Sequence, residues 1–189
     1  ERAECLTERL RRFILRNTFS SSLKEEYCLN LVQIHKIRVE YEDCILKAEL
    51  PVLLPHRKNK YTDYIYKPLF LALQNWCKER QQQGKEIPVY ERATVCFIHE
   101  YDKKLPGSRI RDHDNIEEKQ VVDALGMYFL VSDSGLHLDT YHTTILGERD
   151  CTFLFLMEYN QFPKWICKRY HLGIISKNHP IPATGFSTG

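Results

Sequence analysis

The sequence lacks any Cys-x-x-Cys pair, although it contains seven cysteines. Their odd number and scattered spacing argue against both a disulfide framework and a zinc knuckle. Several of them occur within apolar runs such as residues 94–98, where a free cysteine behaves as a small hydrophobic residue. We therefore expect a reduced, cytoplasmic protein.

Long apolar runs are also missing, and no segment is extensive enough to span a bilayer. The first residues lack the pattern of a signal peptide, so no membrane contact is expected. The sequence contains no Walker loop, Rossmann glycine pattern, Gly-x-Ser-x-Gly or His-Glu-x-x-His motif. These absences argue against nucleotide hydrolases and dehydrogenases.

Neither sign of charge is in excess, because 27 basic residues nearly balance 25 acidic ones and leave a formal net charge of +2. Such a chain has no general attraction for polyanions, so nucleic-acid binding would depend on local clusters. Two basic loops offer such clusters, although each alone is typical of a solvated loop. The candidate nucleic-acid-binding residues in them are Arg57, Lys58, Lys60, Lys103, Lys104, Arg109 and Arg111.

The composition indicates a folded protein, with 43% hydrophobic and 12% aromatic residues. A length of 189 residues suits one domain with a helical extension. We expect a helical extension over residues 1–36, a domain over 37–159 and a partly flexible tail over 160–189.

The hydrophobic period changes several times along the chain, which indicates alternating helices and strands. Pro68 is expected in the first turn of its helix, where its missing N–H costs least. The expected fold is α+β, with a mixed or antiparallel sheet and helices on one face. We predict helices at 1–36, 64–83 and 114–126, a hairpin at 37–54, and strands at 89–100, 136–145 and 149–159.

An acidic segment follows the second basic loop, where Asp112 and Asp114 flank His113 before a predicted helix. Carboxylate oxygens suit Mg²⁺, which keeps several waters and can activate one of them for phosphodiester hydrolysis. His113 is a candidate for proton transfer or DNA contact. His137 and His142 are expected to be structural or surface residues.

The same segment has a purely structural interpretation. Asp114 with Glu117 matches a helix-capping arrangement, in which the aspartate accepts from free backbone N–H groups. Lys119 and Asp123 have the spacing of an ordinary ion pair on a helix surface. The segment alone does not decide between a cap and a metal site.

The segment resembles the RusA-like Holliday-junction resolvases over residues 44–158. The shared features are a basic stretch, Asp112-His113-Asp114-Asn115, a lysine on the following helix, the triplet Asp123-Ala124-Leu125, and a later acid. The resemblance implies that Asp112, Asp114 and Asp133 bind Mg²⁺ (or Mn²⁺), that Lys119 is catalytic, and that Asn115 orders the acidic turn. Together Asp112, Asp114, Lys119 and Asp133 are the candidate catalytic residues.

Two positions depart from the family's pattern. One extra residue precedes the Asp-Ala-Leu triplet, so that Glu118 takes the lysine position when it is counted from Asp112. The family's pair of acids after the helix is here Asp133-Ser134. Asp139 or Glu118 could replace the missing acid, or the site has degenerated.

The resemblance implies a magnesium-dependent, structure-selective endonuclease that cleaves Holliday junctions or other branched DNA as a homodimer. One alternative is a catalytically degenerate module on the same scaffold, which binds nucleic acid or docks a protein partner through residues 1–36. A third hypothesis is a metal-dependent hydrolase of small phosphodiesters. DNA-sequence preference and the number of metal ions cannot be read from the sequence.

Overall fold

The computed structural model describes residues 2–57 and 63–171. The chain divides into two compact units, residues 1–159 and 160–189, and each is described by itself. The candidate DNA-binding residues Lys58 and Lys60 lie outside the described residues.

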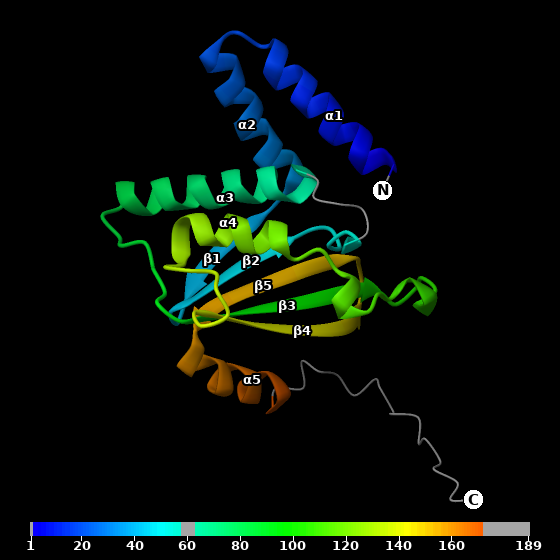
Figure 1. Ribbon diagram of the computed structural model, residues 1–189, viewed down its shortest axis with the longest axis vertical. Coiled ribbons are helices and arrows are strands. Elements are labelled where there is room, and N and C mark those ends of the chain that lie inside the picture. The colour runs from blue at the N-terminus through cyan, green and yellow to red at the C-terminus, as the bar shows by residue number, and fades with distance from the viewer. Residues whose placement is uncertain (1, 58–62, 172–189) are drawn as a thin grey trace, which may run out of the picture. The chain divides into compact units, whose positions relative to one another are not determined.

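A five-stranded sheet forms the centre of the first unit (Figure 1). Its spatial order is β1-β2-β5-β3-β4, and every neighbouring pair is antiparallel except β3 and β4, which are parallel. The predicted α+β class is thereby confirmed, and the sheet is mixed. The strands are β1 (Arg38–Glu42), β2 (Ile45–Leu50), β3 (Ala93–Asp102), β4 (Leu138–Gly147) and β5 (Cys151–Glu158).

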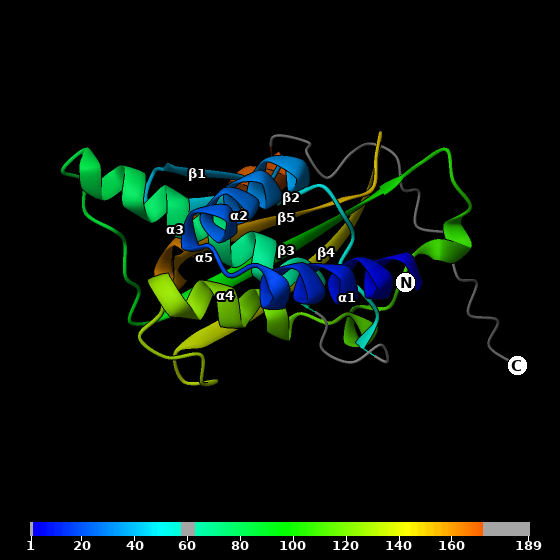
Figure 2. The same ribbon diagram turned by 90° about the horizontal axis from the view of Figure 1, so that it is seen from above.

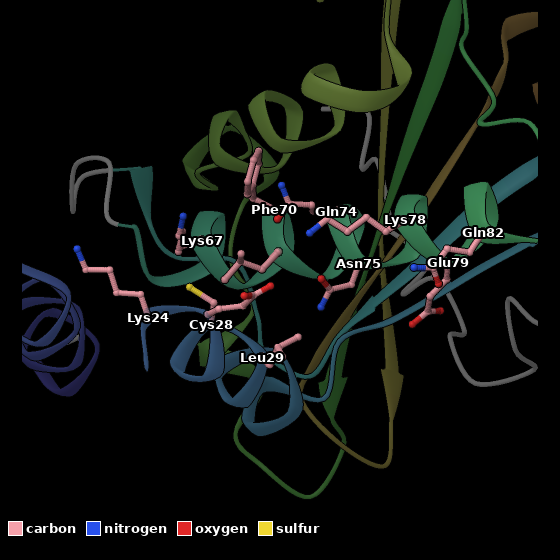
Figure 3. A pocket seen from close by; sticks show the side chains of 12 residues that line it. Lys24, Cys28, Leu29, Lys67, Phe70, Gln74, Asn75, Lys78, Glu79 and Gln82 are labelled. Carbon is pink, nitrogen blue, oxygen red and sulfur yellow. The ribbon is translucent and has the colours of Figure 1, made fainter. Parts of the chain in front are cut away.

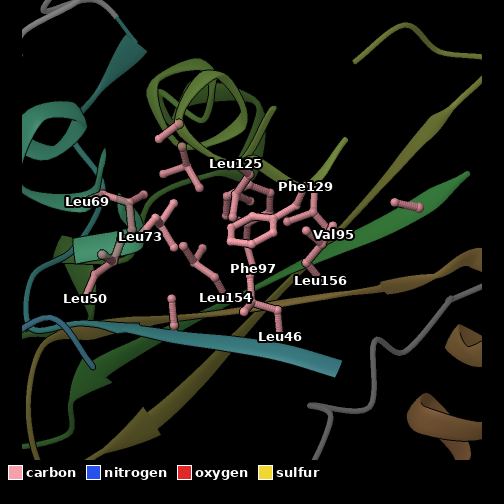
Figure 4. Packing of buried hydrophobic residues seen from close by; sticks show 14 of the residues in the cluster. Leu46, Leu50, Leu69, Leu73, Val95, Phe97, Leu125, Phe129, Leu154 and Leu156 are labelled. Carbon is pink, nitrogen blue, oxygen red and sulfur yellow. The ribbon is translucent and has the colours of Figure 1, made fainter. Parts of the chain in front are cut away.

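Helices α3 (Asp63–Gln82) and α4 (Lys119–Phe129) cover one face of this sheet (Figures 1 and 2). Alternation along the strands directs every second side chain to that face, and the helices contribute apolar residues at three- and four-residue spacing. The resulting core is nearly inaccessible to water. Figure 4 shows its centre, which includes Leu46, Leu50, Leu69, Leu73, Val95, Phe97, Leu125, Phe129, Leu154 and Leu156.

The N-terminal segment forms two helices, α1 (Arg2–Asn17) and α2 (Ser21–His35), on the side of α3 that faces away from the sheet (Figure 1). The side chain of Ser20 caps α2 by accepting from the Leu23 N–H at 3.4 Å. Lys36 ends α2 in the left-handed conformation, with φ of 51°.

Pro68 is the sixth residue of α3 counted from Asp63, so the prediction that it lies in the first turn is wrong. Proline has no N–H, and the carbonyl of Tyr64 four residues earlier therefore loses its usual donor. Arg11 of α1 donates to that carbonyl at 3.2 Å, and its guanidinium lies 5.1 Å from the centroid of the Tyr64 ring. Helix α1 thus supplies the hydrogen bond that the proline removes.

Regular structure extends further towards the C-terminus than the sequence periodicity predicted. In the second unit, α5 (Phe162–His171) is a helix, and the rings of Phe162 and Trp165 stack with centroids 6.2 Å apart. Residues 172–189 lie outside the described residues. Within the described ranges, no helix combines the length and the apolar character needed to cross a bilayer.

Candidate functional site

The acidic segment lies in the loop that joins β3 to α4, at the carboxyl end of β3. Because β3, α4 and β4 form a parallel β-α-β unit, this loop occupies the position where many α/β proteins bind ligands. Two short 3-10 turns shape it, Gly107–Arg109 and His113–Asn115. The sequence therefore places its unusual polar residues at an edge suited to a binding site.

Backbone and side-chain hydrogen bonds hold the loop in place. The N–H of Glu117 donates to the Pro55 carbonyl at 2.9 Å. The guanidinium of Arg111 donates to the Leu54 carbonyl, and the N–H of Arg111 donates to the Tyr101 hydroxyl at 3.1 Å. The loop is thus attached to the segment after β2 and to the end of β3.

The structure corrects the predicted start of the helix that follows the loop. Helix α4 begins at Lys119, five residues after Asp114, which lies in the second 3-10 turn. The capping role predicted for Asp114 is therefore wrong, although the Glu117 carboxylate accepts from the Lys119 N–H at 3.2 Å. Asp114 instead accepts from the Nδ2 of Asn115 at 3.3 Å. The break arises because the chain turns to bond with Pro55 before the helix starts.

The three candidate metal ligands line different hollows. Asp112 lines one of about 410 Å³ together with Arg109 and Arg111. Asp114 lines a second of about 260 Å³, and Asp133 lines a third of about 440 Å³. Within residues 2–57 and 63–171, no group of three or more His, Cys, Asp or Glu side chains is arranged to hold a metal ion.

Lys119 forms the surface ion pair that its spacing predicted. Its Nζ lies 2.7 and 2.9 Å from the two carboxylate oxygens of Asp123. This hydrogen bond raises the pKa of Lys119, and the charges of Asp123, Asp133 and Glu117 act in the same direction. Lys119 also lines the hollow of Asp114, and its partner Asp123 lines the hollow of Asp133.

Most basic residues of the second loop are paired with acids from the β4–β5 turn. Lys103 and Lys104 pair with Glu148, the latter at 3.7 Å, and Arg109 pairs with Asp150. Because the pairs with Glu148 are exposed, Lys103 and Lys104 can exchange Glu148 for another anion. Arg57 of the first basic loop is exposed and lines the Asp114 hollow.

A cluster of three histidines lies beside the acidic loop, and the sequence indicated only one of them. His99 on β3 and His142 on β4 approach to 3.2 Å between Nε2 and Nδ1. His113 covers them from the loop, with its ring centroid 5.5 Å from that of His142 and 5.6 Å from that of His99. Its Nε2 lies 2.9 Å from the Thr144 hydroxyl. For His142 the sequence predicts a structural or surface role, because the parallel pairing of β3 with β4 cannot be read from it.

The hydrogen bonds assign protons within this cluster. The carboxylate of Glu118 can only accept from the Nε2 of His142, at 2.7 Å. A neutral His142 then accepts at Nδ1, so the Nε2 of His99 is the donor. The result is a hydrogen-bonded chain from the buried His99 to the half-exposed Glu118.

Burial dominates the electrostatics of the cluster. Desolvation lowers the pKa of His99 to about 3, and the charges of His142, His113 and Arg111 act in the same direction. Desolvation and the charge of His142 also lower the pKa of His113, against the opposing effect of Asp112. The imidazoles of His99 and His113 are therefore neutral at physiological pH, and the exposed His113 can accept a proton.

A further hollow, of about 670 Å³, lies between α2 and α3 (Figure 3). Its lining alternates between the basic side chains of Lys24, Lys67 and Lys78 and the acidic Glu25 and Glu79. It is remote in sequence from the acidic loop and carries none of the candidate residues.

Comparison with known proteins assigns the chain to a family. The family of unknown function DUF6100 matches residues 1–179, so the chain belongs to that family. One solved structure with similarity is a Salmonella typhimurium protein provisionally described as a translation initiation inhibitor. It is 10% identical, with a TM-score of 0.24, over 65% of this chain and 88% of its own. That resemblance is too weak to support an argument. A search of curated proteins found no match.

Proposed function

We propose that the protein is a RusA-like endonuclease that cleaves Holliday junctions and other branched DNA with Mg²⁺ or Mn²⁺. The observation that carries this proposal is the loop at the carboxyl end of β3. It presents Asp112 and Asp114 beside Arg109, Arg111 and the first residue of α4. Acids that can bind a cation and arginines that can bind phosphate thus occur on one fixed segment.

The donor chemistry of Asp112 and Asp114 fits Mg²⁺, which proteins commonly bind through one or two carboxylates. The three acids line three separate hollows, so the fit rests on the donor chemistry of Asp112 and Asp114 within one short loop and not on a shared cavity. When bound, the cation would supply an activated water and stabilise charge on the leaving oxygen. The guanidinium groups of Arg109 and Arg111 have further N–H donors for the DNA backbone beyond those used within the protein.

His113 and Lys119 would complete the chemistry. The neutral imidazole of His113 adjoins both acids and can accept a proton. Lys119 lines the Asp114 hollow and keeps its positive charge, which would stabilise a phosphorane-like transition state. A homodimer would present two equivalent sites to the two-fold symmetry of a junction.

A catalytically degenerate module that binds branched nucleic acid is the second candidate. It is favoured by the division of Asp112, Asp114 and Asp133 among three hollows and by the engagement of Lys119 with Asp123. Ser134 replaces the second acid of the family's pair. Such a module would retain DNA affinity without hydrolysis.

A cleavage assay on a labelled four-way junction separates the two candidates, with linear duplex of equal length as the control substrate. We expect paired nicks on the junction in Mg²⁺ or Mn²⁺ and none in EDTA. Asp112→Asn should abolish the nicks while junction binding remains. Lys119→Met should slow them by roughly 100-fold.

Asp43→Asn is the matched control variant, because Asp43 lies in the β1–β2 turn at the opposite end of the sheet. It should cleave as the unaltered protein does. Tight junction binding without nicks in either metal would establish the degenerate module instead. Persistent cleavage by the Asp112→Asn variant would exclude this acidic loop as the active site.

A further inference from the structure

Helix α1 has its charged and apolar faces reversed relative to an ordinary surface helix. Glu8 and Arg11 are only 7% and 8% exposed, whereas Leu6, Leu10 and Phe13 are 59%, 53% and 65% exposed. At about 100° per residue, the three apolar residues form one stripe, and Glu8 and Arg11 lie on the other side of the helix. The stripe faces outwards rather than towards α2 and α3.

Polar contacts of the inner face fix this orientation. Arg11 donates to the Tyr64 carbonyl at 3.2 Å and contacts the Nε2 of His35 on α2. Glu8 forms an ion pair with Arg12. Turning α1 to bury the stripe would break the contacts of Arg11 and leave the Tyr64 carbonyl without a donor beside Pro68. The contacts of Arg11 therefore hold α1 in the orientation that exposes the stripe.

The apolar surface continues beyond α1. Ile14 extends the stripe, Phe19 in the turn after α1 is 94% exposed, and Leu23 at the start of α2 is exposed as well. Contiguous apolar surface of this kind marks an interaction site, whereas scattered exposed residues do not. We call Leu6, Leu10, Phe13, Ile14, Phe19 and Leu23 the apolar stripe.

The charges beside the stripe identify the kind of partner. Arg9 and Arg16, two turns apart and both exposed, follow one edge of it. The other edge carries the uncharged Ala3 and Thr7. An antiparallel pair of α1 helices would set the two arginine edges against each other, and a parallel pair would match arginines with uncharged residues. A second copy of the chain therefore gains nothing from these charges.

We propose that the apolar stripe docks an amphipathic helix of a partner protein whose apolar face is flanked by acidic residues. The apolar faces would pack as in other helix-in-groove complexes, and the acids would pair with Arg9 and Arg16. This docking function is independent of the acidic loop at β3.

The test uses the full chain and two synthetic peptides of about 18 residues, a length sufficient for a helix. Both peptides carry leucines at helical spacing, and their flanking positions are glutamate in one and lysine in the other. Fluorescence anisotropy should show that the glutamate peptide binds at least about tenfold more tightly. The double variant Arg9→Glu, Arg16→Glu should reverse this preference.

The double variant Leu10→Asp, Phe13→Asp should lose both peptides, with circular dichroism confirming that it remains folded. Arg38→Glu with Lys85→Glu is the matched control, because both are exposed basic residues outside α1 and α2, and it should keep the original preference.

Three results would overturn the proposal. The first is equal or absent binding of the two peptides. The second is a self-association in sedimentation equilibrium that Leu10→Asp, Phe13→Asp abolishes, which would identify a second copy as the occupant. The third is binding to phosphatidylserine vesicles without any preference between the peptides, which would identify a lipid surface.

Discussion

His99 illustrates how a single buried side chain can make folding depend on pH. It is 1% exposed, and desolvation lowers the pKa of His99 to about 3. In the unfolded chain the same imidazole takes up a proton near pH 6.5. Protonation therefore favours the unfolded state, so the stabilisation is complete above pH 6.5 and is lost as the pH falls towards 3. His35 behaves in the same way, because burial and Arg11 lower the pKa of His35 to about 4.

We predict that the melting temperature falls steadily between pH 6.5 and pH 4. In His99→Gln, which keeps a donor for His142, the melting temperature at pH 7 should be lower but its dependence on pH should be weaker. Adding a His35→Gln substitution should flatten the dependence further. Thermal unfolding followed by circular dichroism measures both. A His99→Gln variant with an unchanged slope would contradict the assignment of His99 as a buried neutral group.

At the scale of elements, α1 and α3 are coupled through the peptide group that Pro68 leaves incomplete. A proline inside a helix usually costs about 3 kcal/mol, partly through the lost hydrogen bond. Here Arg11 replaces the missing donor at the Tyr64 carbonyl. The hydrogen bond that attaches α1 to α3 thus depends on the carbonyl that Pro68 leaves without a helical donor.

A double-mutant cycle tests this coupling. Arg11→Met should destabilise the unaltered protein, because it leaves the Tyr64 carbonyl without a donor. It should destabilise Pro68→Ala less, since alanine restores the helical N–H, and the difference should be about 0.5–1.5 kcal/mol. Urea unfolding of the four proteins measures it. Additive free energies would mean that Arg11 acts only through His35 and the Tyr64 ring.

The elements also show which features a sequence alone can reveal. The strands and most helices follow from local patterns, because alternating burial in β2 reflects one buried face and the apolar run of β5 reflects a central strand. The sequence predicts the start of α4 five residues too early, since Asp114 with Glu117 resembles a cap while the bond to Pro55 is non-local. The position of Pro68 was mistaken for the same reason, because its compensating donor comes from α1.

The candidate site was predictable only in part. The acidic loop and Lys119 were identified because they are contiguous in sequence. The histidine cluster was not, because His99 and His142 meet only through the parallel pairing of β3 with β4. Neither strand carries a sequence motif that predicts this pairing. A lone histidine on a strand also usually has a structural role. Convergence of distant residues is what the sequence does not display.

At the scale of the whole molecule, the nearly equal numbers of basic and acidic residues allow the basic residues near the acidic loop to form ion pairs within the protein. Glu148 and Asp150 neutralise Lys103, Lys104 and Arg109, three of the residues proposed to contact DNA. The pairs of Glu148 are exposed and contribute little to stability, whereas Asp150 is half-buried and also accepts from the Asp102 N–H at 3.0 Å. Both acids compete with DNA phosphates for these basic residues, and Glu148 does so while contributing little to the fold.

We predict that Glu148→Gln with Asp150→Asn raises junction affinity at low salt. It should also steepen the dependence of log K on log salt, by about 0.9 for each basic residue that gains a phosphate contact. Anisotropy titrations between low and physiological salt measure the slope. Glu26→Gln, which removes an exposed acid on α2, serves as the control and should change neither quantity. An unchanged slope in the double variant would exclude these basic residues from the DNA contact.

The place of β5 within the sheet has a consequence for how the protein is made. Leu50 at the end of β2 pairs with Thr152 of β5. The β1–β2 hairpin therefore lacks its neighbouring strand until about 100 further residues have been synthesised. At ribosomal speeds of roughly 5–20 residues per second, the nascent chain exposes that edge for on the order of 5–20 seconds. Until β5 emerges from the ribosome, the edges of β2 and β3 that pair with it remain without hydrogen-bond partners. Newly synthesised chains should therefore depend on chaperones, and a stop codon before residue 151 would yield a product that aggregates.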